Sequence, residues 1–243
     1  MLRLSTLLVG TLMTLVGCGS VQTERGPAVD FSGRWLPDPS QAQPWPDPLP
    51  LTPEARARVA EFVPEQHDPT HFCMPFGTPR NTLATEFPME IVQTPERLTM
   101  IFQPDLSNAE VRRIHLDGRG LPAEPDAGWF GTSVGRWEGS TLVIETVGID
   151  PDVIVSSNGL PHSGALRIVE RLSLVQDPQR GRTLVDEMTL EDPGAYTEPL
   201  RTRRYFTWAP GVQFRDSHCG ERLWIEKLWR DRLEEHASKA RSE

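Results

Sequence analysis

The sequence of 243 residues has little positive charge and no long apolar segment. Its 25 Lys and Arg residues stand against 34 Asp and Glu residues, which gives a formal net charge of −9. This balance argues against nucleic acid or an anionic membrane surface as the main partner. The apolar run at the start of the chain is too short for a comfortable membrane span. We therefore expect a small-molecule ligand or substrate, and the sequence leaves the oligomeric state open.

Cysteine is also scarce, with three residues in the whole chain and no C-x-x-C spacing. Cys18 lies near the N-terminus, whereas Cys73 and Cys219 lie in the body of the chain. In an exported protein, two such cysteines are readily paired, so we predict a Cys73–Cys219 disulfide. The alternative is a catalytic or metal-bound thiol, because His71 and His218 lie close to the two cysteines in the sequence.

Short spacings, which mark many metal sites, are also missing among the four histidines considered as ligands. The histidines that could contribute to a site formed from distant parts of the chain are His71, His115, His162 and His218. Without a close pair among them, we predict neither a metal nor a cofactor.

The N-terminus has the pattern of a lipoprotein signal. Residues 1–17 place one Arg before an apolar run of signal-peptide length, and Leu15-Val16-Gly17-Cys18 resembles a bacterial lipobox. The resemblance implies that Cys18 carries the lipid and that residues 18–29 form a tether. Gly19, in place of Asp, favours the outer membrane, so we expect a lipid-anchored envelope protein that faces the periplasm. A plain signal peptide or an uncleaved anchor is the alternative.

The body of the chain has an all-β pattern. Apolar residues make up 37% of the sequence and charged residues 24%, which is ordinary for a globular protein. From Met89 onward, about eight to ten short strand patterns follow one another without helical crossovers. We therefore predict an antiparallel β-barrel over residues 30–222. The tripeptide Gly33-Arg34-Trp35 resembles the start of lipocalins, where the Trp plugs the closed end of the barrel.

Two further segments accompany the predicted barrel. Residues 36–88 are rich in proline, and we expect an ordered loop insertion with one short helix that begins with Thr52 as N-cap and Pro53 at the first position. Residues 223–243 have an amphipathic helical pattern with Ile225, Leu228, Trp229 and Leu233 in one stripe. We expect this helix to pack on the barrel.

The candidate catalytic groups lie in the central strand pattern. Arg113, His115 and Asp117 share one face, and Ile114 and Leu116 lie on the other. A histidine suits proton transfer near neutral pH, a carboxylate can orient it, and an arginine can clamp an anion. Alternation assigns these residues to faces but does not say which face is inside. We expect the Arg113–His115–Asp117 face to line a pocket, with a solvent-facing position as the alternative.

Other residues complete this predicted site. His162, in a loop between strands, is the third candidate for catalysis, because loop residues at a barrel mouth are often functional. The predicted substrate-binding residues are Arg113, Arg136, Trp137, Glu138 and Glu170. By contrast, Gly131-Thr132-Ser133-Val134-Gly135 has the letters of a nucleophile elbow without its strand-turn-helix context. We interpret these glycines as positions where strands pack closely.

Several motifs together resemble a large family of bacterial exported proteins and lipoproteins, most of them uncharacterised. They are RRIHLDGR, GTSVGRWEGSTLVIET, GLPHSGALRIVER, LEDPGAYTEP and SHCGE. The resemblance covers about residues 68–221. The resemblance implies export, a β-rich body and a shared site, but it does not imply a particular activity.

Three hypotheses follow for the function. The first is an envelope enzyme that acts on a small, partly apolar molecule by cofactor-independent acid–base chemistry, as a lyase, isomerase, hydratase or hydrolase. The second is a lipocalin-like lipoprotein that binds such a molecule without catalysis. The third is a structural lipoprotein. Ionisable groups that converge in one pocket would favour the first, and the absence of a pocket would favour the third.

Overall fold

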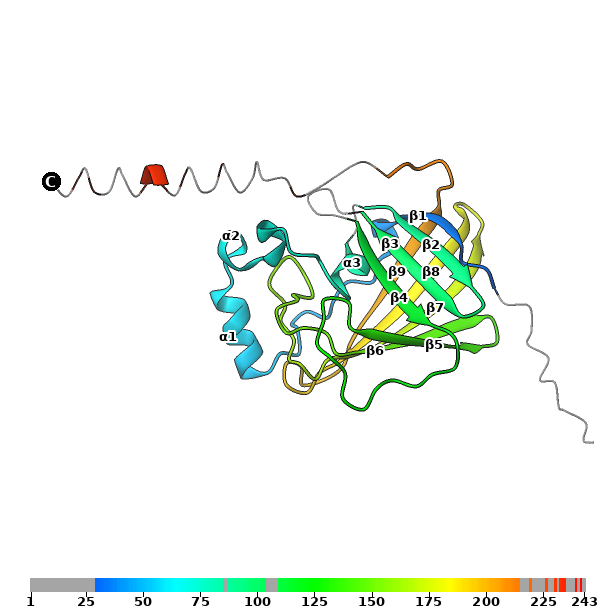
Figure 1. Cartoon of the computed structure of the whole chain (residues 1–243), viewed down its shortest axis with the longest axis horizontal. Helices are drawn as coiled ribbons and strands as arrows, with labels where there is room; N and C mark the ends of the chain where they lie inside the picture. The colour runs from blue at the N-terminus through cyan, green and yellow to red at the C-terminus, as the bar shows by residue number, and fades with distance from the viewer. Residues whose placement is uncertain are drawn as a thin grey trace, which may run out of the picture.

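The computed structural model describes residues 29–84, 87–103 and 109–214, together with Cys219 and positions 226, 230, 232–234, 239 and 241 of the tail. The nine described strands form a closed barrel in sequence order (Figure 1). They are β1 (Gly33–Pro37), β2 (Met89–Thr94), β3 (Arg97–Phe102), β4 (Glu110–His115), β5 (Thr132–Glu138), β6 (Thr141–Val147), β7 (Arg167–Asp177), β8 (Gly181–Glu191) and β9 (Leu200–Trp208). The predicted β-barrel is confirmed.

The barrel is mixed, so the expectation of a wholly antiparallel sheet is wrong. Strands β4 and β5 run parallel, with Ile114 opposite Ser133 and His115 opposite Val134. The physical reason is the long connection over residues 116–131, which returns the chain to the end where β4 began. A tight hairpin cannot do this, because it reverses the strand direction.

The proline-rich segment is more helical than expected. Between β1 and β2, the described residues contain η1 (Pro39–Gln41), α1 (Pro53–Glu61), α2 (Pro64–His67), η2 (Pro69–Phe72) and α3 (Arg80–Leu83). Thr52 caps α1 as predicted, since its side chain accepts a hydrogen bond from the Ala55 amide. The expectation of a single helix is wrong because prolines start the other short turns too; their fixed φ suits the first turn of a helix. Figure 1 shows α1 and α2 at one end of the barrel.

Two apolar clusters lie at different heights of the barrel. One fills the end near Trp35, which is fully buried and donates its indole N–H to the Phe31 carbonyl at 3.0 Å. Its members include Met89, Ile91, Leu98, Met100, Phe102, Ile114, Leu142, Ile144, Leu172, Leu184 and Phe206. The other cluster joins the helical end to the barrel and includes Leu51, Leu83, Ile149, Val153, Leu160, Ile168, Met188, Leu190, Tyr196 and Leu200. The Gly33-Arg34-Trp35 tripeptide thus contributes a buried Trp to one end of the barrel.

Residues 38–51, which we call the strap, extend the barrel wall where β1 ends. Strand β1 pairs with β9 only as far as Pro37 opposite Phe206. Beyond that point the strap follows β9, with the Asp38 amide donating to Tyr205 O at 2.7 Å and the Gln43 amide to Arg203 O at 3.0 Å. The proline-rich segment therefore covers one side of the barrel as well as one end.

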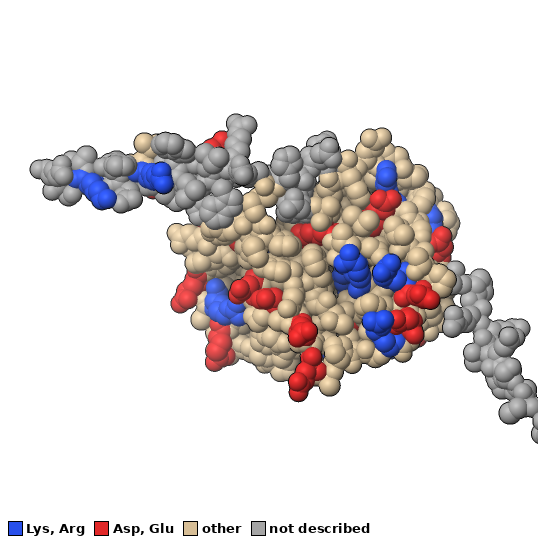
Figure 2. Space-filling view, in the orientation of Figure 1, with Lys and Arg blue, Asp and Glu red and all other residues tan. Residues whose placement is uncertain are grey.

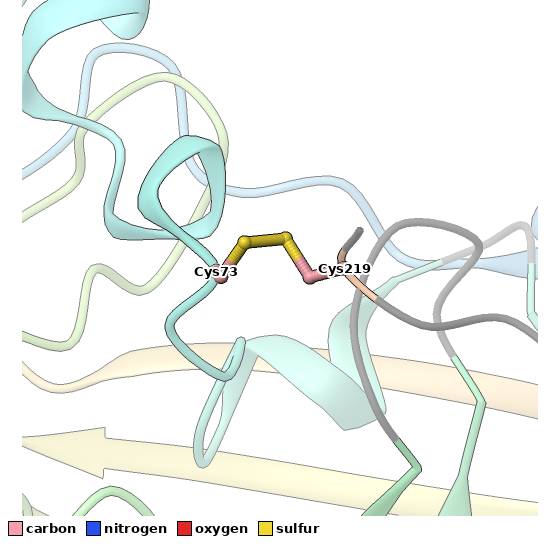
Figure 3. The surroundings of a disulfide bond; sticks show 2 residues. All are labelled: Cys73 and Cys219. Carbon is pink, nitrogen blue, oxygen red and sulfur yellow. A yellow bond between two sulfur atoms is a disulfide. The ribbon is translucent and has the colours of Figure 1, made fainter. Parts of the chain in front are cut away.

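The predicted disulfide is present. Cys73 and Cys219 are bonded, with 5.5 Å between their Cα atoms and 146 positions between them in sequence (Figure 3). The bond ties the segment after η2 to the chain that follows β9, so it closes a loop that contains most of the barrel.

Both ends of the chain lie largely outside the described residues. This applies to the predicted signal at residues 1–17, to Cys18 with most of its tether, and to Ile225, Leu228 and Trp229 of the predicted C-terminal stripe. The described tail residues 226, 230, 232–234 and 239 are helical, and Leu233 is 64% exposed. The packing of the predicted stripe on the barrel stays a prediction, because its other members lie outside the described residues. No helix in the described part of the chain is long and apolar enough to cross a membrane.

Candidate functional site

A layer of polar side chains crosses the barrel interior between the two apolar clusters. On β7, Glu170 lies between Ile168 of one cluster and Leu172 of the other, and on β8 Asp186 lies likewise between Met188 and Leu184. We call this layer the polar belt; its members are Arg112, Ser133, Thr146, Glu170, Asp186, Thr202 and Arg204. Alternation along the strands places all of them on the inner face.

An ion pair between Arg112 and Glu170 forms the centre of the belt. Arg112 Nη1 donates to Glu170 Oε1 at 2.8 Å, and Nη2 donates to Glu170 Oε2 and, at 2.8 Å, to Thr146 Oγ1. The hydroxyl of Ser133 lies 2.8 Å from Thr146 Oγ1 and within reach of the guanidinium. Both charged side chains are fully buried. Such a pair is bidentate and satisfied, so it leaves little capacity for a ligand.

Asp186 and Arg204 are the unsatisfied members of the belt. They are direct partners on β8 and β9. Asp186 is 2% exposed, and neither carboxylate oxygen has a hydrogen-bond partner among the residues that the structure describes. Burial raises the pKa of Asp186 well above its usual range, and the negative charge of Glu170 adds to the rise. The Nε of Arg204 is buried and equally unpartnered within these residues.

The predicted face of Arg113, His115 and Asp117 points away from the barrel interior. Arg113 is exposed, and His115 is partly exposed. Asp117 lies beyond the end of β4 and pairs with Arg119, with 2.6 Å between Oδ2 and Nη2. The expectation that this face lines the barrel is therefore wrong, because the neighbouring residues Arg112 and Ile114 occupy the interior.

A pocket lies over this outer face, beside the disulfide. Its volume is about 310 Å³, and its lining residues are Cys73, Pro75, Ala109, Glu110, Val111, Arg113 and Phe130. Of the predicted catalytic and substrate-binding residues, only Arg113 is among them. Glu110 is buried below, where its Oε1 accepts from the Phe76 amide at 2.5 Å and its Oε2 from the Gly77 amide at 3.3 Å. We call this hollow the outer pocket.

The other predicted binding residues are distributed over several surroundings. Arg136 and Glu138 form an exposed ion pair at 3.0 Å on the outside of β5. Figure 2 shows that positive and negative side chains are interspersed on the visible face, which is typical of a solvated surface. Trp137 turns inward and stacks on Phe31, with ring centroids 5.6 Å apart, at the Trp35 end of the barrel. Glu170 belongs to the belt. These residues do not form one pocket.

His162 lies at the helical end, in the connection between β6 and β7. Its side chain is fully buried, and its Nδ1 lies 2.6 Å from the Ser163 carbonyl oxygen. Its Nε2 has no partner within the described ranges. Burial lowers the pKa of His162, so the ring is held neutral. A groove of about 270 Å³ nearby is lined by Arg58, Glu61, Phe62, His67, Pro151, Asp152, Ile154, Gly159 and Pro161.

The serine motif has a structural explanation. Ser133 lies within β5 rather than at a strand-helix turn. A Cβ at Gly135 would lie 2.6 Å from Leu116 Cδ2, and one at Gly131, where φ is +61°, would lie 2.6 Å from the Val147 carbonyl oxygen. These glycines allow neighbouring segments to approach closely, so the packing interpretation is confirmed.

Arg112, Asp186 and Arg204 were not among the predicted site residues. Asp186 is a charged residue between the buried Leu184 and Met188, whereas Arg112 and Arg204 each have one apolar alternate neighbour, Ile114 and Phe206 respectively. That pattern, a charge within the apolar face of a strand, is the signal that could have identified them.

Within residues 29–84, 87–103 and 109–214, no three His, Cys, Asp or Glu side chains are grouped closely enough to hold a metal ion. Of the four histidines considered for a metal site, His218 lies outside the described residues. Comparison of the chain with protein-family models, curated proteins and solved structures finds no match.

Proposed function

We propose that the protein is a lipid-anchored envelope protein that binds a small molecule with an apolar body and an anionic group in the outer pocket. The single observation that carries this proposal is the position of Arg113. It stands exposed at the edge of a hollow whose other walls are largely apolar. A guanidinium is the side chain best suited to hold a carboxylate or another oxyanion.

The dimensions and walls of the outer pocket support this proposal. Its volume of about 310 Å³ lies at the lower end of the range for small-molecule sites. Val111, Phe130 and Pro75 supply apolar surface, and the disulfide restrains the wall at Cys73. Aromatic and aliphatic walls with one well-placed charge are typical of such sites.

Glu110 is compatible with an anionic ligand, although it also lines the pocket. Its carboxylate accepts hydrogen bonds from the Phe76 and Gly77 amides and from Asn81 Nδ2 at 3.4 Å. These three donors stabilise the negative charge of Glu110, and they hold the segment that follows Cys73 against β4, where it forms one wall of the outer pocket. The anionic group of a ligand then interacts with Arg113 at the solvent side.

The geometry favours binding over acid–base catalysis. His115 lies on the outside of β4, Asp117 pairs with Arg119, and His162 lies in a connection at the helical end. None of the three lines the outer pocket. An acid and a base must both reach the same substrate, so the predicted trio supports no shared reaction centre.

The envelope location rests on three independent features of the chain. The lipobox-like sequence before Cys18 and the resemblance to bacterial exported proteins both indicate export. The Cys73–Cys219 disulfide is consistent with an oxidising compartment. Replacement of Cys18 by Ser should release the protein from the membrane fraction and remove the lipid-dependent shift in mass. An unchanged mass and continued membrane association would contradict the lipid anchor.

The binding proposal is tested with anilinonaphthalene sulfonate, an aromatic probe that carries one anionic group. In a fluorescence titration of the mature chain, Arg113→Gln should weaken saturable binding about tenfold or more, because a charge-assisted hydrogen bond is lost. The matched control is Arg201→Gln, an exposed arginine on the outside of β9, which should leave binding unchanged. Equal affinities for the native chain and Arg113→Gln would overturn the proposal.

A further inference from the structure

We infer that a second ligand site lies inside the barrel, where Asp186 and Arg204 together hold a small carboxylic acid. The inference is independent of the outer pocket, since it rests on different residues on the opposite side of the barrel wall. Its starting point is the hydrogen-bonding capacity that the polar belt leaves unused.

The belt separates into a saturated half and an unsaturated half. Arg112 and Glu170 satisfy each other, and Ser133 and Thr146 complete their contacts. Asp186, 2% exposed, has two oxygens without a hydrogen-bond partner in the described chain. A buried polar group left without a partner costs about 1–3 kcal/mol. A protein that retains such a group commonly has a partner for it, either water or a ligand.

Arg204 provides the complementary donor. It is the direct partner of Asp186 across β8 and β9, so their side chains start about 5 Å apart. Its Nη1 donates to Thr202 Oγ1 at 2.7 Å and to the Gln43 carbonyl at 3.0 Å, whereas its Nε is buried and unpartnered in the described residues. One edge of the guanidinium is thereby anchored while another donor is left for a ligand.

The charges of the belt indicate which ligand fits. Arg112 and Glu170 cancel, and a neutral Asp186 leaves the positive charge of Arg204 without a counter-ion among the described residues. A carboxylate compensates that charge and accepts hydrogen bonds from Arg204 Nε and from the protonated Asp186 carboxyl group. A cationic ligand would instead add to the positive charge. Apolar neighbours on the same strands, Leu184, Met188 and Phe206, favour a short aliphatic body.

The strap is the route to this site. Gln43 accepts from both Thr202 and Arg204, and the Trp45 ring centroid lies 5.9 Å from Arg204 Cζ. These strap residues cover the side of the barrel where β1 has ended. A small acid therefore reaches Asp186 and Arg204 when the strap separates from β9.

Binding should depend on pH through Asp186. The charged groups that influence it are Glu170 on β7, Arg112 on β4, Arg204 on β9 and the outward-facing Glu187 on β8. The carboxylate binds the neutral form of Asp186 and is repelled by the ionised form. Affinity should then be highest between the pKa of the ligand acid and the pKa of Asp186, and it should fall about tenfold per pH unit above the pKa of Asp186.

The experiment is a calorimetric titration of the mature chain with acetate, propionate and butyrate across a pH series. We expect saturable binding of one carboxylate per chain with this pH profile. Asp186→Asn, which imitates the neutral acid, should keep the affinity and remove the pH dependence. Arg204→Gln should weaken binding at least tenfold, whereas the outward control Arg201→Gln on β9, which is not among the charges that act on Asp186, should change neither property.

Two results would overturn the inference. The first is that the native chain binds none of the three carboxylates saturably. In that case an interior water alone would be the partner of Asp186. The second is a pH profile that persists in Asp186→Asn. Neither result depends on Arg113, so failure here is distinguishable from failure of the outer pocket, which the Arg113→Gln titration reports.

Discussion

Strand β4 has two faces that place the same kinds of side chain in opposite surroundings. Arg112 is fully buried and bound to Glu170, Ser133 and Thr146, whereas the next residue, Arg113, is exposed at the outer pocket. The same guanidinium group therefore stabilises the fold on the inner face of β4 and is accessible to a ligand on the outer face. The difference shows that burial and partners, rather than residue type, decide which charge can take part in binding.

The same comparison holds for the two histidines that the sequence suggests for catalysis. His162 is fully buried with a ring held neutral, and His115 lies partly exposed on the outside of β4. On β4, substitution of the inward Arg112 should therefore lower the free energy of unfolding, whereas substitution of the outward Arg113 should weaken binding without a comparable loss of stability.

The largest effect is expected at the buried ion pair. Glu170→Leu should lower the free energy of unfolding by about 3–5 kcal/mol, because it leaves the buried charge of Arg112 uncompensated. The double variant Arg112→Met with Glu170→Leu should recover most of this loss, since two apolar side chains replace the pair. Urea unfolding of the three proteins measures both values. A single variant that is as stable as the native chain would show that the pair is not buried as described.

A smaller effect is expected from the disulfide, which restrains the wall of the outer pocket. The double variant Cys73→Ser with Cys219→Ser should lose about 2–4 kcal/mol of unfolding free energy, because the unfolded chain regains the freedom of a long loop. It should also bind the sulfonate probe more weakly. Matched unfolding curves with and without reductant for the native chain provide the control. Unchanged stability on reduction would contradict a structural crosslink.

The smallest effect concerns pH and His162. Because burial lowers its pKa in the folded state, the unfolded chain binds the additional proton first as the pH falls. Stability due to this residue is therefore retained above the unfolded pKa and decreases as the pH falls through the unfolded pKa, by at most about 1.4 kcal/mol per pH unit. Asp186 acts in the opposite direction, since its raised pKa favours the folded state at lower pH.

The variant comparison isolates the histidine contribution. The free energy of unfolding is measured against pH for the native chain and for His162→Gln. The difference between the two curves should show the expected decrease towards low pH. His115→Gln serves as the control and should keep the native profile. Two identical profiles for the native chain and His162→Gln would rule out a buried neutral ring.

Local patterns were sufficient to predict much of the architecture. Strand patterns gave the barrel, Thr52 and Pro53 gave the start of α1, and export with two body cysteines gave the disulfide. Each of these depends on neighbouring residues or on a single pairing choice. The parallel β4–β5 pair could not be predicted this way, because it depends on where the connection over residues 116–131 travels in space.

The site was harder to predict, because alternation on β4 is symmetrical. It assigned Arg113 and His115 to one face and Arg112 and Ile114 to the other, and only packing against the remaining strands determines which face is inside. The hydrogen-bond partners of Arg112 come from β5, β6 and β7, and the charges that act on Asp186 from other strands come from β4, β7 and β9. Contacts that join distant strands leave no local signal apart from a charged residue in an apolar row.

The most direct measurement compares the unfolding free energies of Arg112→Ala and Arg113→Ala under identical conditions. The account predicts that Arg112→Ala loses about 3–5 kcal/mol, because Glu170 remains as an unpaired buried charge. Arg113→Ala should stay within about 0.5 kcal/mol of the native chain, as is usual for an exposed position. Equal losses in the two variants, or a larger loss for Arg113→Ala, would contradict the assignment of the two faces of β4.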